Sequence, residues 1–233
     1  MNISLFLRSL FHVYVPQLCR ICGGELLSGE RELCRKCLDS LPRTFFEIEK
    51  DNICEQRFWG IVDMHSVFSI YYFRRGEWIQ RLIHKVKYNR CRELGIVLGG
   101  EIGRIMIQND LVKDYDMLVP IPLHYKKQAL RGYNQAQLLA EGISNITGLL
   151  VCPDIIKKNI DNSTQTHKDK YERYLNTHDV YSLCVSCDTL SNKHILLVDD
   201  VLTTGNTAAA CARLFSNLPN TYVGVVTLGL ASI

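Results

Sequence analysis

The sequence predicts an α/β protein, in which a parallel sheet flanked by helices follows a small cysteine-rich N-terminal domain. From Ser66 onwards, strand-like and helix-like runs alternate, as they do when crossover helices join parallel strands. The first 60 residues contain two Cys-x-x-Cys pairs, and residues 194–210 combine an apolar strand, two adjacent carboxylates and a glycine-containing loop. We therefore expect two domains, residues 1–60 and residues 61–233.

The expected elements follow from the spacing of apolar residues along the chain. Ser66–Phe73 is rich in β-branched and aromatic residues and predicts a strand, whereas Trp78–Tyr88 has apolar residues at helical spacing. The later elements are expected at Leu94–Ile107 (helix), Met117–Ile121 (strand), Ala136–Ile146 (helix), Ile195–Val198 (strand), Thr207–Phe215 (helix) and Tyr222–Leu228 (strand).

Composition places the chain among ordinary globular proteins. Its 233 residues are 47% hydrophobic and 22% charged, and the net charge of +3 is too small to indicate a polyanionic partner by itself. No 18-residue apolar run predicts a transmembrane helix. Residues 1–18 are apolar but contain Arg8 and lack a small-residue cleavage site, so we expect an amphipathic helix that packs on the body, not a signal peptide.

The most informative segment is the one around Asp199 and Asp200. These carboxylates follow the apolar strand Ile195–Val198, and the loop Thr203–Thr207 then opens an alanine-rich helix. A glycine that lets backbone approach a phosphate, followed by a helix start with free N–H groups, is typical of an anion site. Neighbouring carboxylates suit sugar hydroxyls, or Mg²⁺ held through water. The alternative is a strand that ends in Asp, followed by a threonine-capped helix.

Two cysteine pairs predict a metal site in the N-terminal domain. Cys19 and Cys22 form the first pair, and Cys34 and Cys37 form the second. Two such knuckles complete a tetrahedral Zn²⁺ site with no open position, so we expect a structural ion. An iron–sulfur cluster or a redox pair is the alternative. The remaining cysteines are scattered, which favours a reducing cytoplasm over a disulfide framework: Cys54, Cys91, Cys152, Cys184, Cys187 and Cys211.

Three further segments carry polar or charged side chains. Arg74–Arg92 contains seven Lys or Arg and one acidic residue, interspersed with aromatics, so it predicts either a nucleic-acid-binding surface or a solvated helix face. Val119–His124 ends a strand and precedes several cations, which suits pyrophosphate or is simply a basic loop. Ser163–His167 is polar and predicts a loop or lid.

Taken together, these residues resemble the ComF family of competence-associated proteins, which join two cysteine knuckles to a type I phosphoribosyltransferase-like domain. The resemblance covers nearly the whole chain in order. It rests on the four knuckle cysteines and on LIHKVKY (82–88), VPIPLH (119–124), RGYNQAQLLA (131–140), TQT (164–166) and LLVDDVLTTGNT (196–207).

The resemblance implies a type I phosphoribosyltransferase fold that binds 5-phosphoribosyl 1-pyrophosphate (PRPP) with Mg²⁺. Asp199 and Asp200 would hold the ribose hydroxyls, and Thr203–Thr207 would surround the 5-phosphate. The implied PRPP-binding residues are Asp199, Asp200, Val201, Leu202, Thr203, Thr204, Gly205, Asn206 and Thr207. The candidates for the pyrophosphate loop and the closing loop are Pro120, Ile121, Pro122, Lys87, Arg131, Gln165 and Arg173.

One departure concerns the residues before the TQT segment. The family usually has arginines there, whereas this chain has Lys157, Lys158, Asn159 and Ile160. We therefore assign no transition-state contact to these positions. No catalytic residue, such as a general base, is predicted either.

Two functions remain open at this stage. The first is an enzyme that transfers phosphoribosyl from PRPP to an unidentified acceptor. The second is an accessory protein that acts with the DNA-uptake or helicase machinery. It would bind single-stranded DNA through residues 74–92 and the knuckles and use PRPP as a regulatory ligand.

Overall fold

The computed structural model describes residues 17–88, 91–159 and 180–231. The chain forms two compact units, which divide between Pro42 and Arg43. The helix expected over residues 1–18 lies almost entirely outside the described residues. In the first unit the structure describes one helix, α2 (Arg35–Asp39), and the other described helices and strands belong to the second unit.

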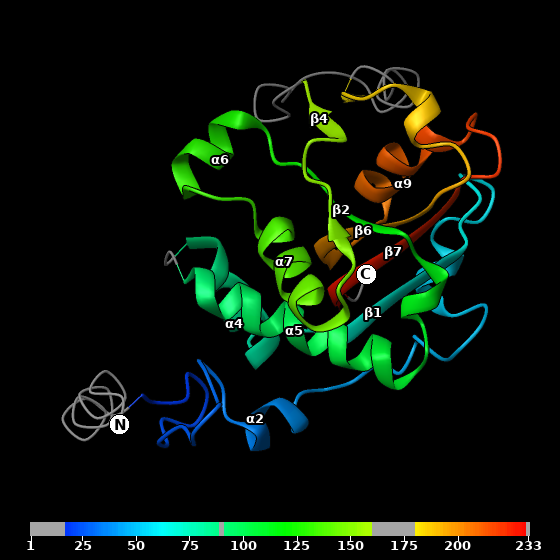
Figure 1. Ribbon diagram of the computed structural model, residues 1–233. Coiled ribbons are helices and arrows are strands. Elements are labelled where there is room, and N and C mark those ends of the chain that lie inside the picture. Colours follow the sequence, from blue (N-terminus) through cyan, green and yellow to red (C-terminus); the bar gives the residue numbers. More distant parts are fainter. Residues whose placement is uncertain (1–16, 89–90, 160–179, 232–233) are drawn as a thin grey trace, which may run out of the picture. The chain divides into compact units, whose positions relative to one another are not determined.

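A five-stranded sheet forms the centre of the second unit and confirms the predicted α/β class (Figure 1). The strands run in the order β1–β7–β6–β2–β3, and all neighbours in the sheet are parallel. Their bounds are β1 (Ser66–Phe73), β2 (Met117–Pro120), β3 (Leu150–Val151), β6 (His194–Leu202) and β7 (Tyr222–Ala231).

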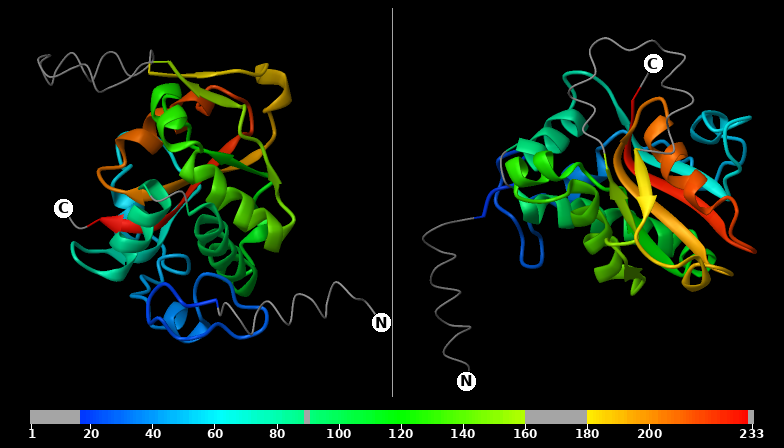
Figure 2. Two further views of the ribbon diagram at one scale, coloured as in Figure 1. Left: turned by 90° about the vertical axis from the view of Figure 1, so that its left-hand side faces the viewer. Right: turned by 90° about the horizontal axis from the view of Figure 1, so that it is seen from above.

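Helices cover both faces of this sheet, as the alternation of strands and helices predicts (Figure 2). One face carries α4 (Trp78–Tyr88), α5 (Arg92–Gln108) and α7 (Gln135–Thr147), and the other face carries α9 (Asn206–Ala212). The shorter described elements are α3 (Ile53–Gln56), α6 (Tyr125–Arg131), the antiparallel pair β4 (Ile156–Lys158) and β5 (Tyr181–Leu183), and the 3-10 turns Val112–Asp114, Cys187–Thr189 and Arg213–Phe215.

Strands β6 and β7 are longer than the sequence predicts, whereas β2 ends one residue earlier than predicted, at Pro120. The bounds of β1 and α4 agree with the prediction, but β6 continues past Val198 to Leu202. The reason is its neighbour β7, which provides partners for Asp199 (Thr227) and Leu202 (Leu230). The predicted strand end was therefore wrong, because polar side chains do not end a strand that still has a backbone partner.

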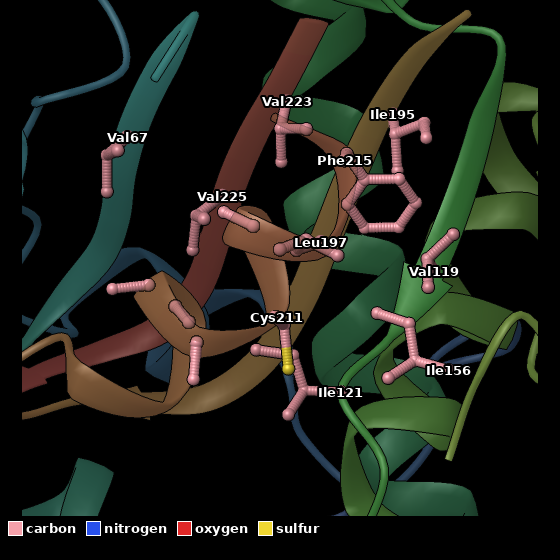
Figure 3. Close-up of a cluster of buried hydrophobic side chains, with 14 of the residues drawn as sticks. Val67, Val119, Ile121, Ile156, Ile195, Leu197, Cys211, Phe215, Val223 and Val225 are labelled. Carbon is pink, nitrogen blue, oxygen red and sulfur yellow. The ribbon is translucent and has the colours of Figure 1, made fainter. Parts of the chain in front are cut away.

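The core fills the space between the sheet and α9 (Figure 3). Ile195 and Leu197 of β6 pack there with Cys211 and Phe215, and all four side chains are buried. Alternate residues of β6 point to the opposite face of the sheet, where α4, α5 and α7 lie. Burial on both faces explains why this strand reads as a continuous apolar run.

The connector 43–60, which we expected in the N-terminal domain, lies in the second unit. Thr44 N donates to Ile70 O over 3.0 Å, and the buried Asn52 donates through Nδ2 to Val67 O over 3.1 Å. These bonds hold the connector against strand β1. The units therefore divide at residue 42, not near residue 60.

Candidate functional site

The strand order reverses between β2 and β6, and the region outside the carboxyl ends of these two strands is called the crevice below. From β2 the chain continues to β3 on one side, and from β6 it continues to β7 on the other side. In open α/β sheets, ligands bind outside the carboxyl ends of the strands at such a reversal of strand order. Val198 of β6 pairs with Pro120, the last residue of β2, so Asp199 and Asp200 lie just beyond the end of β2.

Asp199 and Asp200 form a compact acidic pair at this point. Asp199 accepts a hydrogen bond from the backbone N–H of Asp200 over 2.8 Å, and Asp200 forms a salt bridge of 2.7 Å with Lys87 of α4. Burial and the adjacent Asp200 raise the pKa of Asp199 to about 7, although Lys87 and Lys158 act in the opposite direction. The pair therefore favours hydroxyl donors or a further cation, either of which would stabilise its charge.

The loop after the acidic pair turns at Gly205. This glycine has a φ of 83° in the left-handed region, and a Cβ placed on it would lie 3.2 Å from the ring of Phe58. Thr203, Thr204 and Asn206 are exposed beside it. A larger side chain at Gly205 would be strained and would crowd Phe58, so the glycine fixes the path of the loop.

The connector residues Arg57 and Phe58 support this loop. The sequence did not predict these contacts. Arg57 donates through Nη1 to Leu202 O over 3.1 Å and through Nη2 to Ala231 O over 2.8 Å. Phe58 is buried beneath Gly205. The partners of Arg57 lie 145 and 174 residues further along the chain, so local sequence patterns carry no signal for these contacts.

The RGYNQ segment connects the VPIP loop with α7 and α4. Asn134 caps α7 by accepting from Ala136 N over 3.1 Å, and its Nδ2 donates to Ile121 O over 2.9 Å. Tyr133 donates to the carbonyl oxygen of Val86, near the end of α4. The segment thus fixes the VPIP loop and the helix that carries Lys87. The helix start near Asn134 agrees with the helix predicted from Ala136, but the contact of Asn134 with Ile121 was not predicted.

A second lysine, Lys158, lies near the acidic pair. It ends β4, its Nζ lies 5.1 Å from the centroid of the Tyr181 ring, and its charge helps to keep Asp199 ionised. The sequence assigned no transition-state contact to this lysine, because the family that the chain resembles usually has arginines in this region. The antiparallel pair of β4 and β5 brings it there, and that pairing spans residues that no short motif covers.

The structure brings together some of the expected site residues and leaves others apart. Lys87, Ile121 and the Asp199–Asp200 pair lie at the crevice. Arg131 donates to Gln135 Oε1 over 2.9 Å and lies 5.3 Å from the Tyr88 ring centroid. Gln165 and Arg173, with the rest of the TQT segment, lie outside the described residues.

The four N-terminal cysteines converge, as their spacing predicts. The sulfur atoms of Cys19, Cys22, Cys34 and Cys37 all lie within 4.8 Å of one another. Backbone N–H groups point at two of them, from Gly24 to Cys22 Sγ and from Cys34 to Cys19 Sγ, each over 3.4 Å. This donor set fits a tetrahedral thiolate site, so the cluster could hold a structural zinc ion.

The pKa values of two thiols in this cluster are shifted in opposite directions. Burial opposes ionisation of Cys19, but the backbone N–H groups around its sulfur lower its pKa to about 6. Burial and the neighbouring sulfurs raise the pKa of Cys37. Four thiolates at this distance need a cation between them, and a divalent metal supplies one. In the described part of the chain, this is the one group of three or more metal-type ligands that converges.

The cationic segment lies on α4 and the turn before it. Arg74, Arg75 and Arg81 are exposed, and Arg81 stacks 5.0 Å from the Trp78 ring centroid. Trp78 and Tyr88 are 40% and 64% exposed. The apolar side of the helix is buried, so the cations and aromatics occupy its outer side.

Comparison with known proteins finds relatives over most of the chain. No family model matches it. It is 27% identical over 206 residues to Competence protein F of Haemophilus influenzae, covering 86% of this chain and 79% of that protein. It is 29% identical over 226 residues to DNA utilization protein YhgH of Salmonella typhimurium, covering 86% and 91%. Competence protein ComFC of Bacillus subtilis is 39% identical over 101 residues, covering 42% of this chain and 37% of that protein.

Among the described helices, none has the length and apolar character that crossing a bilayer requires.

Proposed function

Since the chain is a ComF family protein, we propose that it binds Mg²⁺–PRPP in the crevice between β2 and β6 and transfers the phosphoribosyl group to an acceptor. The observation that carries this proposal is the position of the Asp199–Asp200 pair. It lies at the reversal of strand order, directly before a glycine loop and opposite a lysine.

Each part of the crevice has a role in this proposal. The two carboxylates accept hydrogen bonds from the ribose 2- and 3-hydroxyls, and the loop 203–207 surrounds the 5-phosphate with hydroxyls and backbone N–H groups. Lys87 lies 2.7 Å from Asp200, on the side where the pyrophosphate would meet α4. Mg²⁺, when bound, neutralises charge on the pyrophosphate.

The proposed reaction is a displacement at ribose C1. The acceptor forms a bond to C1 with its own electron pair, and the bond between C1 and the pyrophosphate oxygen breaks. Positive charge develops on the ribose ring and negative charge on the leaving group. The protein contributes by holding the reactants and by placing Lys87 near the developing negative charge.

Isothermal titration tests the binding step. Wild-type protein should release or absorb heat with millimolar PRPP and Mg²⁺, and ribose 5-phosphate should bind more weakly. The double variant Asp199→Asn, Asp200→Asn should lose binding but keep its fold. Gly205→Val should lose it too, because its side chain blocks the loop. Asp154→Asn removes an exposed carboxylate elsewhere and is the matched control. No heat with wild type, or equal binding by the double variant, would reject the proposal.

Pyrophosphate release tests the chemical step. Protein that binds PRPP is mixed with candidate acceptors, and free pyrophosphate is measured. Release above the rate without acceptor supports transfer. Binding without release from any acceptor supports a PRPP-sensing protein instead.

A second candidate function is binding of single-stranded DNA in DNA uptake. The names of the relatives refer to competence and DNA utilization. The observation that favours this function here is the outer side of α4, where the exposed Trp78 lies among Arg74, Arg75 and Arg81. Cations can follow a phosphate backbone while aromatic rings stack on bases.

Anisotropy of a labelled oligothymidine tests this second function. Affinity should fall steeply with salt, and Arg74→Glu with Arg75→Glu should abolish binding. Trp78→Ala should weaken binding by about 1–3 kcal/mol if a base stacks on the indole. The chain's other tryptophan gives the control, Trp59→Ala, which should bind normally. Lack of binding at low salt would leave α4 as a solvated helix face.

A further inference from the structure

Arg57 of the connector links the ends of two central strands. It donates through Nη1 to Leu202 O over 3.1 Å and through Nη2 to Ala231 O over 2.8 Å. Leu202 is the last residue of β6, and Ala231 is the last residue of β7. The last residue pair in the register of these two strands is Leu202 with Leu230. One guanidinium group therefore holds both strands at the point where their pairing stops and the loop 203–207 begins.

The bond to Leu202 also orients the first N–H group of the loop. The peptide bond between Leu202 and Thr203 is trans. A trans peptide unit is planar, so its C=O and its N–H point in opposite directions. Because Leu202 O points at Arg57 in the connector, the N–H of Thr203 points away from the connector. Arg57 thus fixes the direction of a backbone donor at the residue where the loop starts.

The next connector residue, Phe58, supports the same loop at its turn. The Phe58 ring is buried, and a Cβ placed on Gly205 would lie 3.2 Å from it. The side chains of Thr203, Thr204 and Asn206 are exposed. The connector therefore supports one side of the loop and leaves the loop's polar side chains accessible to a ligand.

The shape of an arginine side chain suits this position. A guanidinium group is planar and carries its donors in a fixed fork, so Arg57 can bond to carbonyl oxygens of two adjacent strands at once. A lysine ammonium group has the same charge but lacks the fork. The Arg57 side chain is partly buried, and the two carbonyl oxygens compensate for the water that its charge loses there.

We infer that Arg57 is a positioning residue of the proposed PRPP site, because it directs the Thr203 N–H at the 5-phosphate while Phe58 sets the path of the turn. The inference rests on the proposed PRPP binding and adds connector residues that lie outside the motif at Asp199–Thr207. In this role Arg57 acts through the loop and makes no contact with the ligand. Its loss should therefore weaken the binding of the 5-phosphate and not that of the pyrophosphate.

Isothermal titration of the full chain with two ligands tests this role. Arg57→Gln should weaken the binding of PRPP and of ribose 5-phosphate by the same factor, about tenfold, because both ligands carry the 5-phosphate. Arg57→Lys keeps the charge but lacks the fork, so it should also bind both ligands more weakly than wild type. Lys87→Gln should weaken PRPP binding far more than ribose 5-phosphate binding, because only PRPP carries the pyrophosphate.

Arg213→Gln is the matched control for the loss of an arginine. Arg213 donates through Nη2 to Ile61 O over 3.3 Å, so it also bonds to a backbone carbonyl near the connector, but it follows the far end of α9. Both affinities should stay as in wild type. If Arg57→Gln does not fold, Arg57→Lys and Phe58→Leu carry the test, and each should weaken both ligands alike.

Melting temperatures separate positioning from a general structural role. Each titration is run below the melting temperature of its variant, so the unfolded fraction does not affect the measured affinity. A lower melting temperature with unchanged affinities would overturn the inference, and so would full affinity of Arg57→Lys or a loss confined to PRPP. Absence of heat with wild type would reject PRPP binding and this inference with it. Normal binding by wild type and by the Arg57 variants would reject the positioning role alone.

Discussion

The two units of this chain reach a folded state by different means. In the first unit, described from residue 17 to 42, regular structure consists of the short helix α2 and isolated bridges, and four sulfur atoms converge. The second unit buries apolar side chains on both faces of a five-stranded sheet. A segment of about 40 residues usually needs a metal or disulfides to fold, whereas a domain of the second unit's length can rely on its core. Metal and core should therefore be separable by experiment.

Removal of zinc should give the largest effect and should separate the two units. About one Zn²⁺ should copurify per chain, and its binding to a four-thiolate site stabilises the first unit by about 10 kcal/mol or more. Chelation should unfold residues 17–42 and leave the connector 43–60 protected, because its hydrogen bonds run to the second unit. Hydrogen exchange resolved by peptide measures both segments.

Cysteine variants provide the control for the zinc experiment. Cys22→Ser should release zinc, whereas Cys184→Ser, an exposed cysteine outside the cluster, should keep it. Absence of zinc from protein purified under reducing conditions would contradict a metal-dependent first unit.

A helix crossing in the second unit should give the next largest effect. Gly142 of α7 lies so close to α5 that an added Cβ would sit 2.1 Å from Ile96 O. Gly142→Ala must push the helices apart and should destabilise the second unit by about 3 kcal/mol. Both tryptophans, Trp59 and Trp78, lie in the second unit, so their fluorescence measures its unfolding alone. Zinc content should not change.

Gly100 offers a matched control on the same helix pair. A Cβ there would meet nothing closer than 3.6 Å, so Gly100→Ala should be neutral or slightly stabilising. If Gly142→Ala also released zinc, the two units would not be independent and the comparison would fail.

Sequence patterns predicted those parts of the molecule whose partners are close along the chain. The four cysteines and the loop after Asp200 are short motifs, and their geometry follows from local spacing. Local patterns did not predict contacts between distant residues: Asp200 meets Lys87, which only the family resemblance had placed at this site, and Arg57 meets Leu202. The predicted end of β6 at Val198 was wrong for the same reason, because the rest of the strand depends on pairing with β7.

The pH dependence of Asp199 should give the smallest effect and should act on the second unit alone. Its pKa is raised to about 7 by burial and by Asp200, above its ordinary value of 3.8. The folded state therefore binds this proton more tightly than the unfolded state does. The resulting stability is fully present below about pH 4 and is lost as the pH rises through 7. In the first unit the sign is opposite, because acid protonates the thiolates and releases zinc.

Asp199→Asn removes this titration, so the variant should be more stable than wild type at about pH 8. The gain should shrink with acidification and vanish near pH 4. Tryptophan-monitored urea unfolding without Mg²⁺ measures it, and Asp154→Asn, which removes an exposed carboxylate, should show no such gain. A gain that is the same at every pH would contradict a raised pKa at Asp199. Added Mg²⁺ should narrow the gap at high pH, because a cation beside the ionised pair stabilises wild type but has less to bind in the variant.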